Sequence, residues 1–342
     1  MAADGNGIRN GNENGKAAFD RLLRLPKLEL HCHLDGSMTL QSMRDILGRN
    51  ISGEEVEAGD TCRNLAEYLA KFEIPLQCVR SERGLREASR AFLLETAKEN
   101  IRYIEVRFAP LSCVNGSMDC RQAVEAVLAG LEEAKAQCGT HYNVIVCAMR
   151  HHREEDNLEM FKKCREFLGA GVCAADLAGD EASYPMEGFR SLFSEVKKLG
   201  FPFTIHAGEC GRAANVTEAV MCGASRIGHG IALAGNREAI KLCADRRIGI
   251  EMCPRSNLQT RAARKENYPI REFIESGLFV TLNTDNRTVS HTSLTEEMYF
   301  VQNEYGITEE ELWQLQYHAV DAAFASDAVK QELWRELKQA EI

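Results

Sequence analysis

Short apolar runs rich in β-branched residues recur along the whole chain. Such runs are typical of strands buried on both faces of a sheet. The pattern predicts eight strands, at residues 27–30, 101–108, 142–149, 172–177, 203–206, 226–229, 248–252 and 279–283.

Longer stretches between these runs carry apolar residues at the i, i+3, i+4 and i+7 spacing of an amphipathic helix. Clear examples are residues 121–134, 158–168 and 186–199. Strands that alternate with helices, without two-residue hairpin turns, pair in parallel, and eight strand-helix units close a TIM (β/α)8 barrel. We therefore predict an α/β fold of this barrel type.

The chain of 342 residues is longer than the roughly 250 residues of a typical barrel. We expect residues 52–90, which follow the first strand and are helical in pattern, to lie over the barrel mouth as a helical lid. Residues 307–342 are expected to form extra C-terminal helices on the outside. The Gly- and Asn-rich residues 1–18 are expected to be a flexible tail, which leaves residues 19–342 as a single domain.

The composition and net charge of the chain limit the kinds of molecule that we expect it to bind. A formal net charge of -10 disfavours nucleic acid and anionic membrane surfaces, because both need clustered positive charge. The 13 cysteines include no Cys-x-x-Cys pair, so they are interpreted as reduced thiols. No run approaches the roughly 20 apolar residues of a membrane helix, and the N-terminus lacks the apolar core of a signal peptide. We expect a cytoplasmic protein with a small-molecule ligand, and the oligomeric state is left open.

Histidines and carboxylates follow four of the predicted strands, where each strand ends. Because the carboxyl ends of barrel strands meet at one face, we expect these side chains to converge. Imidazoles with a carboxylate suit zinc, with ferrous iron as an alternative, whereas a purely structural hydrogen-bond network is the other interpretation. The residues are His31, His33, Asp35, His206, Glu209, His229 and Asp285.

A metal at this face would lower the pKa of a bound water and make hydroxide available, which indicates hydrolytic chemistry. Glu209 stands three residues beyond His206 and could donate or accept a proton, or it could be an ordinary helix-start carboxylate. Residues 172–181 contain no lysine to bridge two metals, so one metal is favoured. Arg107 and Arg150, near the ends of the second and third strands, are interpreted as structural arginines rather than phosphate binders.

Six motifs in order resemble those of the adenosine deaminase family. They are His31-Cys32-His33-Leu34-Asp35-Gly36, Asp176-Leu177-Ala178-Gly179-Asp180-Glu181, His206-Ala207-Gly208-Glu209, Gly228-His229-Gly230, Cys253-Pro254-Arg255-Ser256-Asn257 and Thr284-Asp285-Asn286. The resemblance runs from about residue 25 to beyond residue 286. It implies a TIM barrel with one zinc ion (Zn2+) that hydrolyses the 6-amino group of a purine nucleoside, converting adenosine, and 2'-deoxyadenosine with it, to inosine and ammonia.

The resemblance also implies roles for individual residues. The metal ligands would be His31, His33, His206 and Asp285, with His33 also counted among the substrate contacts. Glu209 would protonate the purine ring nitrogen beside the reacting carbon, while His229 and Asp285 would orient the attacking water. The Gly179 backbone N–H would meet another ring nitrogen, unless this glycine only makes a tight turn. Asp35 would bind the ribose 5'-hydroxyl and repel a 5'-phosphate.

The lid is expected to cover the nucleoside with one apolar helix face made of Leu65, Tyr68, Leu69 and Phe72. Asn286 departs from the family, in which many members carry a second aspartate. Its amide could donate the same hydrogen bond to the base, but this change leaves the preferred purine open.

Two alternatives follow from these residues. One is a deaminase of another 6-aminopurine, such as free adenine or aminodeoxyfutalosine, on the same barrel. The other is a binding protein that has lost the chemistry, which would be expected to lack Glu209 or a metal ligand.

Overall fold

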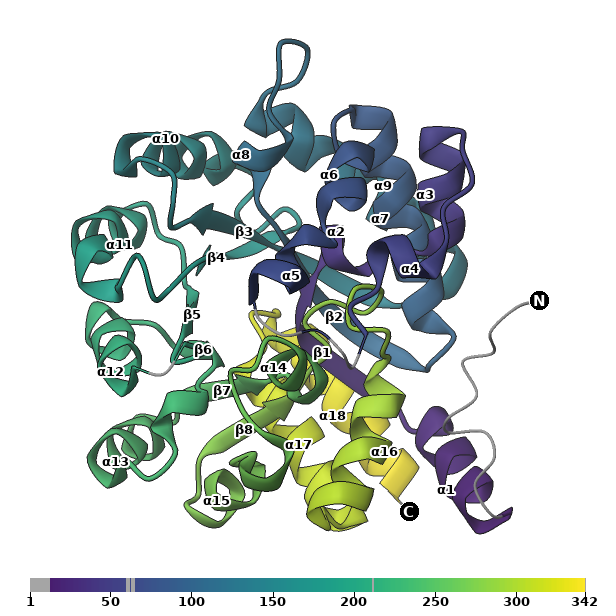
Figure 1. Ribbon diagram of the computed structural model, residues 1–342, viewed down its shortest axis with the longest axis vertical. Coiled ribbons are helices and arrows are strands. Elements are labelled where there is room, and N and C mark those ends of the chain that lie inside the picture. The colour runs from purple at the N-terminus through teal and green to yellow at the C-terminus, as the bar shows by residue number, and fades with distance from the viewer. Residues whose placement is uncertain (1–12, 60–61, 63–64, 211, 342) are drawn as a thin grey trace.

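Parallel strands at the centre and helices around them form the molecule (Figure 1). The computed structural model describes residues 13–59, 62, 65–210 and 212–341. Two four-stranded parallel sheets, in the orders β1-β2-β3-β4 and β5-β6-β7-β8, make the barrel wall. The strands are β1 (Lys27–His33), β2 (Ile101–Phe108), β3 (His141–Met149), β4 (Val172–Ala178), β5 (Thr204–Ala207), β6 (Arg226–His229), β7 (Gly249–Met252) and β8 (Phe279–Leu282).

The two sheets meet at two seams, each held by an isolated parallel bridge. Ala175 pairs with Phe203 at one seam, and Cys32 pairs with Asp285 at the other. At the second seam the Asp285 N–H donates to the His31 carbonyl (3.0 Å), and the His33 N–H donates to the Asp285 carbonyl (2.7 Å). The eight predicted strands are all present, and the predicted α/β barrel class is confirmed.

Helices follow each strand along the chain and bury one face against the sheet. They include α7 (Glu82–Ala97), α8 (Pro110–Cys113), α9 (Cys120–Cys138), α10 (Glu154–Cys164), α11 (Arg190–Lys198), α12 (Ala213–Cys222), α13 (Arg237–Asp245), α14 (Pro254–Gln259), α15 (Ile270–Glu275) and α16 (Leu294–Tyr305). Helix α9 shows why they form: a capping box of Asp119 with Gln122 opens it, and Gly139 in the left-handed conformation closes it. The predicted segment 158–168 begins earlier, at Glu154, and segment 186–199 opens with a 3-10 turn, Met186–Phe189.

Between β1 and α7 the chain forms a series of short helices, as expected for the lid segment. These are α2 (Leu34–Ser37), α3 (Leu40–Leu47), α4 (Gly53–Val56), α5 (Leu65–Ala70) and α6 (Glu73–Cys78). A small apolar cluster of Ala58, Cys62, Tyr68 and Val289 joins this segment to the chain after β8. The segment is therefore anchored at the carboxyl ends of the strands.

The C-terminal segment forms two helices, α17 (Glu309–Ala322) and α18 (Asp327–Glu341). Helix α17 packs against β8 and β1, where the Gln316 side-chain oxygen accepts from the Leu28 N–H at 2.7 Å. Beyond it, the Arg226 guanidinium lies 4.1 Å from the centroid of the Phe324 ring. The extra C-terminal helices are thus present, and the segment after α17 contacts the barrel interior.

The N-terminal segment differs from the expected flexible tail. Helix α1 (Glu13–Arg24) includes residues 13–18, while residues 1–12 lie outside the described residues. The reason is local packing, because the Phe19 ring lies edge-on against Tyr299 of α16, with ring centroids 5.7 Å apart, and Leu22 is buried. Among the described helices, none combines the length and the apolar character that crossing a bilayer requires.

Candidate metal centre and active site

Three imidazoles and one carboxylate meet at the carboxyl ends of the strands. His31 and His33 project from β1, His206 from β5, and Asp285 follows β8; one ligand atom from each lies within 4.8 Å of all the others. Asp285 Oδ1 is 3.3 Å from His31 Nε2 and 3.4 Å from His33 Nε2. The structure therefore brings together the four residues that the sequence predicted as metal ligands.

The ligand atoms of this cluster are better arranged to bind a cation than to form hydrogen bonds with one another. His31 Nε2 is buried and has no hydrogen-bond partner among the described residues, and the Nε2 atoms of His33 and His206 face each other at 3.0 Å. Burial lowers the pKa of His31 to about 4 and that of His33 well below its ordinary value, which favours the neutral imidazoles that bind metal.

Two buried carboxylates accept hydrogen bonds from two of the imidazoles. The bonded atom is Nδ1, on the side of each ring away from the cluster. His31 Nδ1 donates to Glu251 of β7 at 2.8 Å, and His206 Nδ1 donates to Asp176 of β4 at 2.9 Å. Each bond leaves Nε2 directed at the shared centre, as in many metal sites where a carboxylate fixes the histidine tautomer. Sequence reasoning gave Asp176 and Glu251 no role, although a carboxylate inside a buried apolar strand is a signal that could have found them.

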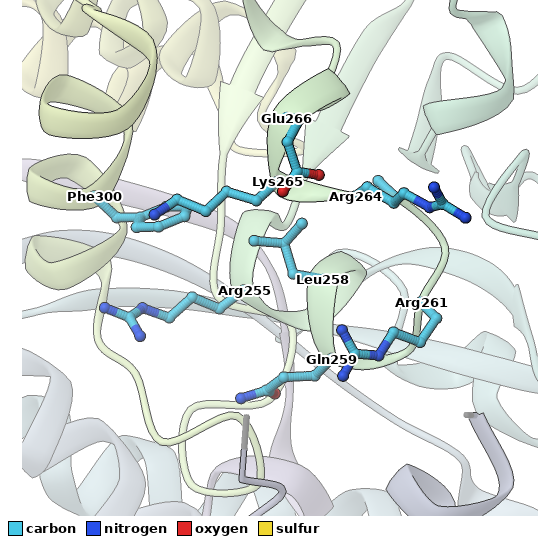
Figure 2. Close-up of a pocket in the computed structure, with 9 residues that line it drawn as sticks. Arg255, Leu258, Gln259, Arg261, Arg264, Lys265, Glu266 and Phe300 are labelled. Atoms are coloured by element: carbon cyan, nitrogen blue, oxygen red, sulfur yellow. The ribbon is translucent and has the colours of Figure 1, made fainter. Parts of the chain in front are cut away.

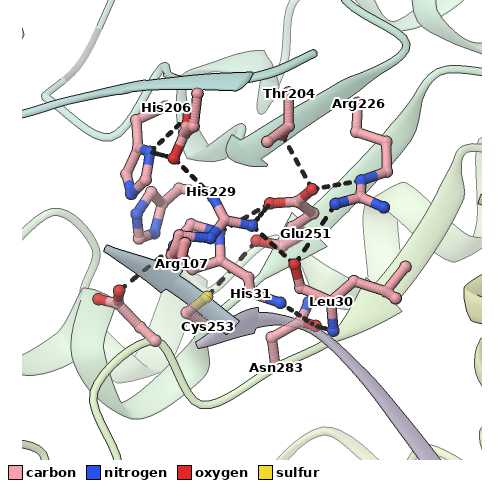
Figure 3. Close-up of polar contacts among 12 residues, drawn as sticks. Leu30, His31, Arg107, Thr204, His206, Arg226, His229, Glu251, Cys253 and Asn283 are labelled. Atoms are coloured by element: carbon pink, nitrogen blue, oxygen red, sulfur yellow. Dashed lines mark hydrogen bonds and ion pairs between the residues drawn. The ribbon is translucent and has the colours of Figure 1, made fainter. Parts of the chain in front are cut away.

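Arg107 of β2 ties these two carboxylates to each other (Figure 3). Its guanidinium donates to Asp176 at 2.9 Å and to Glu251 at 2.9 Å, and it is fully buried. Arg226 donates to the other oxygen of Glu251 at 2.6 Å. Arg150 donates to the His206 carbonyl at 2.7 Å. The interpretation of Arg107 and Arg150 as structural arginines is confirmed.

Glu209 and His229 lie beside the cluster. Glu209 Oε2 is 3.8 Å from His229 Nε2, and the Glu209 side chain is 16% exposed. Asn257 Nδ2 donates to His229 Nδ1 at 2.9 Å, while the Tyr268 hydroxyl donates to Asn257 Oδ1 at 3.2 Å. In this arrangement His229 Nδ1 is the acceptor, which leaves Nε2 as the nitrogen directed toward Glu209.

Backbone strain is concentrated at two of these positions. His229 has φ 67° and Asp285 has φ 63°, both in the left-handed region that non-glycine residues rarely adopt. His229 is the last residue of β6 and Asp285 follows β8, so both lie where a barrel strand ends and the chain turns. Such strain persists only where the surrounding structure fixes it, and it clusters at functional sites.

The Asn286 side chain is linked to the lid through its amide nitrogen. Its Nδ2 donates to the Tyr68 hydroxyl at 3.0 Å, which also bonds Ser290 at 2.7 Å. Its Oδ1 is buried without a partner among the described residues. Only glycine fits at position 36, because a Cβ there would lie 1.9 Å from Asn286 Oδ1.

The other predicted lid residues are placed differently. Tyr68 is buried, whereas Leu69 is 50% exposed. Helix α5 ends at Ala70, so Phe72 lies beyond it and the i, i+7 pattern does not continue as one helix face. Phe72 is partly buried, with its ring centroid 6.0 Å from that of Tyr68. Leu65 lies in α5, but its side chain is outside the described part of the chain.

Asp35 and Gly179 lie at the same barrel face. Asp35 Oδ1 is buried without a hydrogen-bond partner in the described chain, and burial raises the pKa of Asp35 to about 6. Gly179 has φ 103°, which only glycine adopts readily. A Cβ at Gly179 would meet no protein atom closer than 3.5 Å, so the backbone conformation, and not close packing, requires glycine here.

A cavity of about 740 Å³ lies apart from the cluster (Figure 2). It is lined mainly by α14, the loop after it and Phe300 of α16, and no predicted site residue lines it. Two of its cations have acidic neighbours: Lys265 is 2.7 Å from Glu304, and Arg255 is 3.8 Å from Glu297. We assign this cavity no role in the chemistry.

The buried Glu297 side chain predicts how the stability of the protein changes with pH. It is fully buried on α16, where it accepts from the Arg255 N–H at 3.3 Å and from the Thr292 hydroxyl at 2.7 Å. Burial raises the pKa of Glu297 to about 8 from an ordinary value of 4.5. The folded protein therefore keeps this proton where the unfolded chain has lost it, so this group's contribution to stability is lost as pH rises from about 4.5 to about 8.

We expect Glu297→Gln to gain stability relative to the unaltered protein as pH rises through this window. Denaturant unfolding at several pH values, at a fixed metal concentration, measures the difference in free energy of unfolding. The control is Glu275→Gln, an exposed position at the end of α15. A Glu297→Gln difference as flat with pH as that of the control would contradict the assignment.

Comparisons with known proteins agree with this geometry. The sequence model of the family described as adenosine deaminase matches residues 26–340. The adenosine deaminase of Enterococcus faecalis (strain ATCC 700802 / V583) is 38% identical over 330 residues, covering 94% of this chain and 98% of that protein. That of Clostridium botulinum (strain Okra / Type B1) is 38% identical over 329 residues, covering 92% and 98%.

A solved structure has the same fold. The adenine deaminase from Arthrobacter aurescens superposes with a TM-score of 0.84 at 22% identity, covering 92% of this chain and 98% of that one. Family match, relatives and fold agree, and the chain belongs to the adenosine deaminase family.

Proposed function

We propose that this chain catalyses the hydrolytic deamination of adenosine, and of 2'-deoxyadenosine with it, releasing ammonia and leaving inosine from adenosine. The observation that carries the proposal is the buried cluster of three histidines and Asp285, with Glu209 and His229 at its edge. The adenosine deaminases that share 38% identity over nearly the whole chain support the choice of substrate.

The four clustered residues would hold one divalent cation per chain. Three imidazoles and a carboxylate favour Zn2+, and Fe2+ is the alternative. When bound, such an ion supplies the hydrolytic nucleophile by lowering the pKa of water. The second oxygen of Asp285 accepts from the Ser256 hydroxyl at 2.5 Å, which fixes the direction of the carboxylate.

Glu209 is assigned the proton transfer to the purine. Its carboxyl group would donate a proton to the ring nitrogen beside the carbon that carries the amino group, which makes that carbon more electrophilic. The Thr260 hydroxyl donates to Glu209 Oε1 at 3.5 Å, a long contact that leaves Oε2 for the substrate. His229 Nε2–H would orient an oxygen at the reacting centre.

The remaining residues are assigned to substrate binding. Asp35, whose Oδ1 has no partner among the described residues, would accept a hydrogen bond from the 5'-hydroxyl of the sugar. The Gly179 N–H and the Asn286 amide would contact the purine, with His33 beside it. Tyr68 and Phe72, with Leu65 and Leu69 of the same segment, would cover the nucleoside and exclude water.

A second candidate is a deaminase of free adenine, because the adenine deaminase structure covers almost the whole chain. Asp35 argues against it, since adenine has no sugar hydroxyl to satisfy a buried carboxylate. The same carboxylate argues against a 5'-phosphate, which it would repel.

The test is the loss of ultraviolet absorbance when the zinc-loaded protein is mixed with adenosine, adenine or 5'-adenylate in separate reactions. Conversion of adenosine alone is the expected result. Preferential conversion of adenine or 5'-adenylate would overturn the assignment of Asp35. Inactivity toward all three, in a protein that holds its metal, would overturn the proposed substrate.

Exchange of Asn286 for aspartate is expected to alter substrate preference more than stability. An ionised carboxylate can no longer donate to the base or to Tyr68, while the side-chain volume is almost unchanged. We expect the ratio of kcat/KM for adenosine and 7-deazaadenosine, which share the sugar and differ in one ring atom of the base, to shift by about tenfold, which corresponds to the loss of one hydrogen bond.

Asn303→Asp, an exposed amide on α16, is the control for the added charge. Steady-state kinetics with both nucleosides measures the shift, and thermal unfolding checks the fold. A substrate profile identical to that of the control would show that position 286 does not contact the base.

We further propose that residues 19–342 form one domain and that the enzyme acts in the cytoplasm. One apolar cluster that includes residues from Leu22 to Leu315 supports the first point. Deeply buried thiols such as Cys147 and Cys253 are consistent with a reducing compartment.

A further inference from the structure

The turn that carries Glu209 is held by a carboxylate from another part of the barrel. Three successive backbone N–H groups, of Gly208, Glu209 and Cys210, all point at the side chain of Glu181, with donor-to-oxygen distances of 2.6, 3.0 and 3.1 Å. Glu181 lies in the turn after β4, far from this segment in sequence. Consecutive N–H groups around one anion form a backbone nest, which in proteins binds negative charge.

The Glu181 side chain is buried and is held in place by hydrogen bonds. It is 2% exposed, and the Asn215 side chain of α12 donates to its Oε1 at 2.7 Å. Asn215 is held in turn, because its Oδ1 accepts from the Met186 N–H at 3.0 Å. The Glu181 carboxylate thus accepts four hydrogen bonds, two on each oxygen, which is about its full capacity.

The turn has little freedom to adopt another arrangement. Gly208 has φ 74°, and a Cβ there would lie 2.7 Å from the Val216 side chain. Without the Glu181 carboxylate, three neighbouring donors would lose their common partner, and the backbone that aims the Glu209 side chain would move. Proton transfer is sensitive to displacements of a fraction of an ångström.

We propose that Glu181 is a positioning residue for Glu209: it fixes the backbone on both sides of the proton donor by binding the N–H groups of residues 208–210. This inference rests on the proposed function, in which Glu209 transfers the proton. Sequence reasoning quoted Glu181 within a motif and gave it no role, because its partners come from a different strand-helix unit.

The test is a double-mutant cycle between positions 181 and 209. In Glu181→Gln the amide nitrogen replaces one acceptor, so part of the nest loses its bonds while the size of the side chain is kept. We expect kcat for adenosine to fall by about 10- to 100-fold, with KM changed by less than about threefold and the metal content per chain unchanged. Asp180→Asn, in the same turn with its carboxylate bonded locally to Ser183, is the matched control and should stay close to the unaltered enzyme.

The decisive comparison is with Glu209→Gln. If Glu181 acts through Glu209, the double variant Glu181→Gln/Glu209→Gln is no slower than Glu209→Gln alone, assayed at high enzyme concentration. Multiplied losses, or an unchanged kcat in Glu181→Gln, would overturn the proposal. An active Glu209→Gln enzyme, or an unaltered protein without activity on adenosine, would instead contradict the proposed function itself.

A milder variant keeps the test usable if Glu181→Gln does not fold. Asn215→Ala removes one of the four bonds and leaves the carboxylate in place. We expect a two- to fivefold loss of kcat that likewise disappears in the Glu209→Gln background, together with faster amide exchange in a peptide spanning residues 207–210. Protection equal to that of the unaltered protein, with the kcat loss persisting in the Glu209→Gln background, would count against the role of Glu181.

Discussion

Glu209→Gln is expected to lose nearly all turnover on adenosine while keeping its metal. The amide cannot deliver the carboxyl proton to the ring nitrogen, and positioned acid catalysis typically contributes about 10²- to 10⁴-fold in rate. Glutamine preserves the size of the side chain and can still meet the Thr260 hydroxyl, which lies 3.5 Å from Oε1. The loss should therefore appear in kcat, with little effect on substrate binding.

Single-turnover and steady-state rates on adenosine measure the effect, and elemental analysis counts the metal per chain. Glu187→Gln, an exposed position that follows β4, controls for the loss of one negative charge. A Glu209→Gln enzyme with a near-normal rate would remove Glu209 from the role of acid. A variant that lost its metal as well would place Glu209 in the metal site, contrary to the cluster of three histidines and Asp285.

His33→Ala is expected to abolish metal binding and activity together. His33 supplies one of the four convergent donor atoms, and its Nε2 lies 3.0 Å from that of His206 and 3.4 Å from Asp285 Oδ1. Removing one of four ligands leaves the site open and weakens the affinity for metal by far more than removing an outer partner does. The apparent melting temperature should also become insensitive to added zinc.

Zinc titration followed by competition with a chelator measures the affinity, and thermal unfolding with and without zinc measures the linkage. The control is His141→Ala, a half-buried histidine at the start of β3, 3.4 Å from Glu332. If His33→Ala remained metal-replete and active, His33 would not be a ligand.

The fold could be predicted because a parallel strand buried on both faces leaves a local signature. The eight strands appear as apolar runs in the sequence, and His31 and His33 alternate with Cys32 in a way that sends both rings to the barrel interior. The convergence of His206 and Asp285 followed from the general rule that strand ends meet. These inferences need only a residue's own neighbours and the overall topology.

The residues that sequence reasoning missed are those whose role depends on a partner in another strand. Asp176 and Glu251 matter because each meets a particular imidazole and both meet Arg107, and Glu181 matters because it meets the turn at 208–210. The spacing of residues within one segment of the sequence does not predict contacts with another segment. The placement of Phe72 outside the lid helix was missed for a related reason, since a helix period does not show that α5 ends at Ala70.

The seam between β8 and β1 has a further consequence. The bridge between Cys32 and Asp285 joins the first and the last strand of the barrel, and the four clustered residues come from both half-barrels: His31 and His33 from one, His206 and Asp285 from the other. A cation bound by all four would act as a covalent-like cross-link between parts of the chain that are distant in sequence, much as a disulfide closing a long loop does. Metal loss would then remove a cross-link across this seam, so we expect a chelator to lower the stability of this protein as well as to inhibit it.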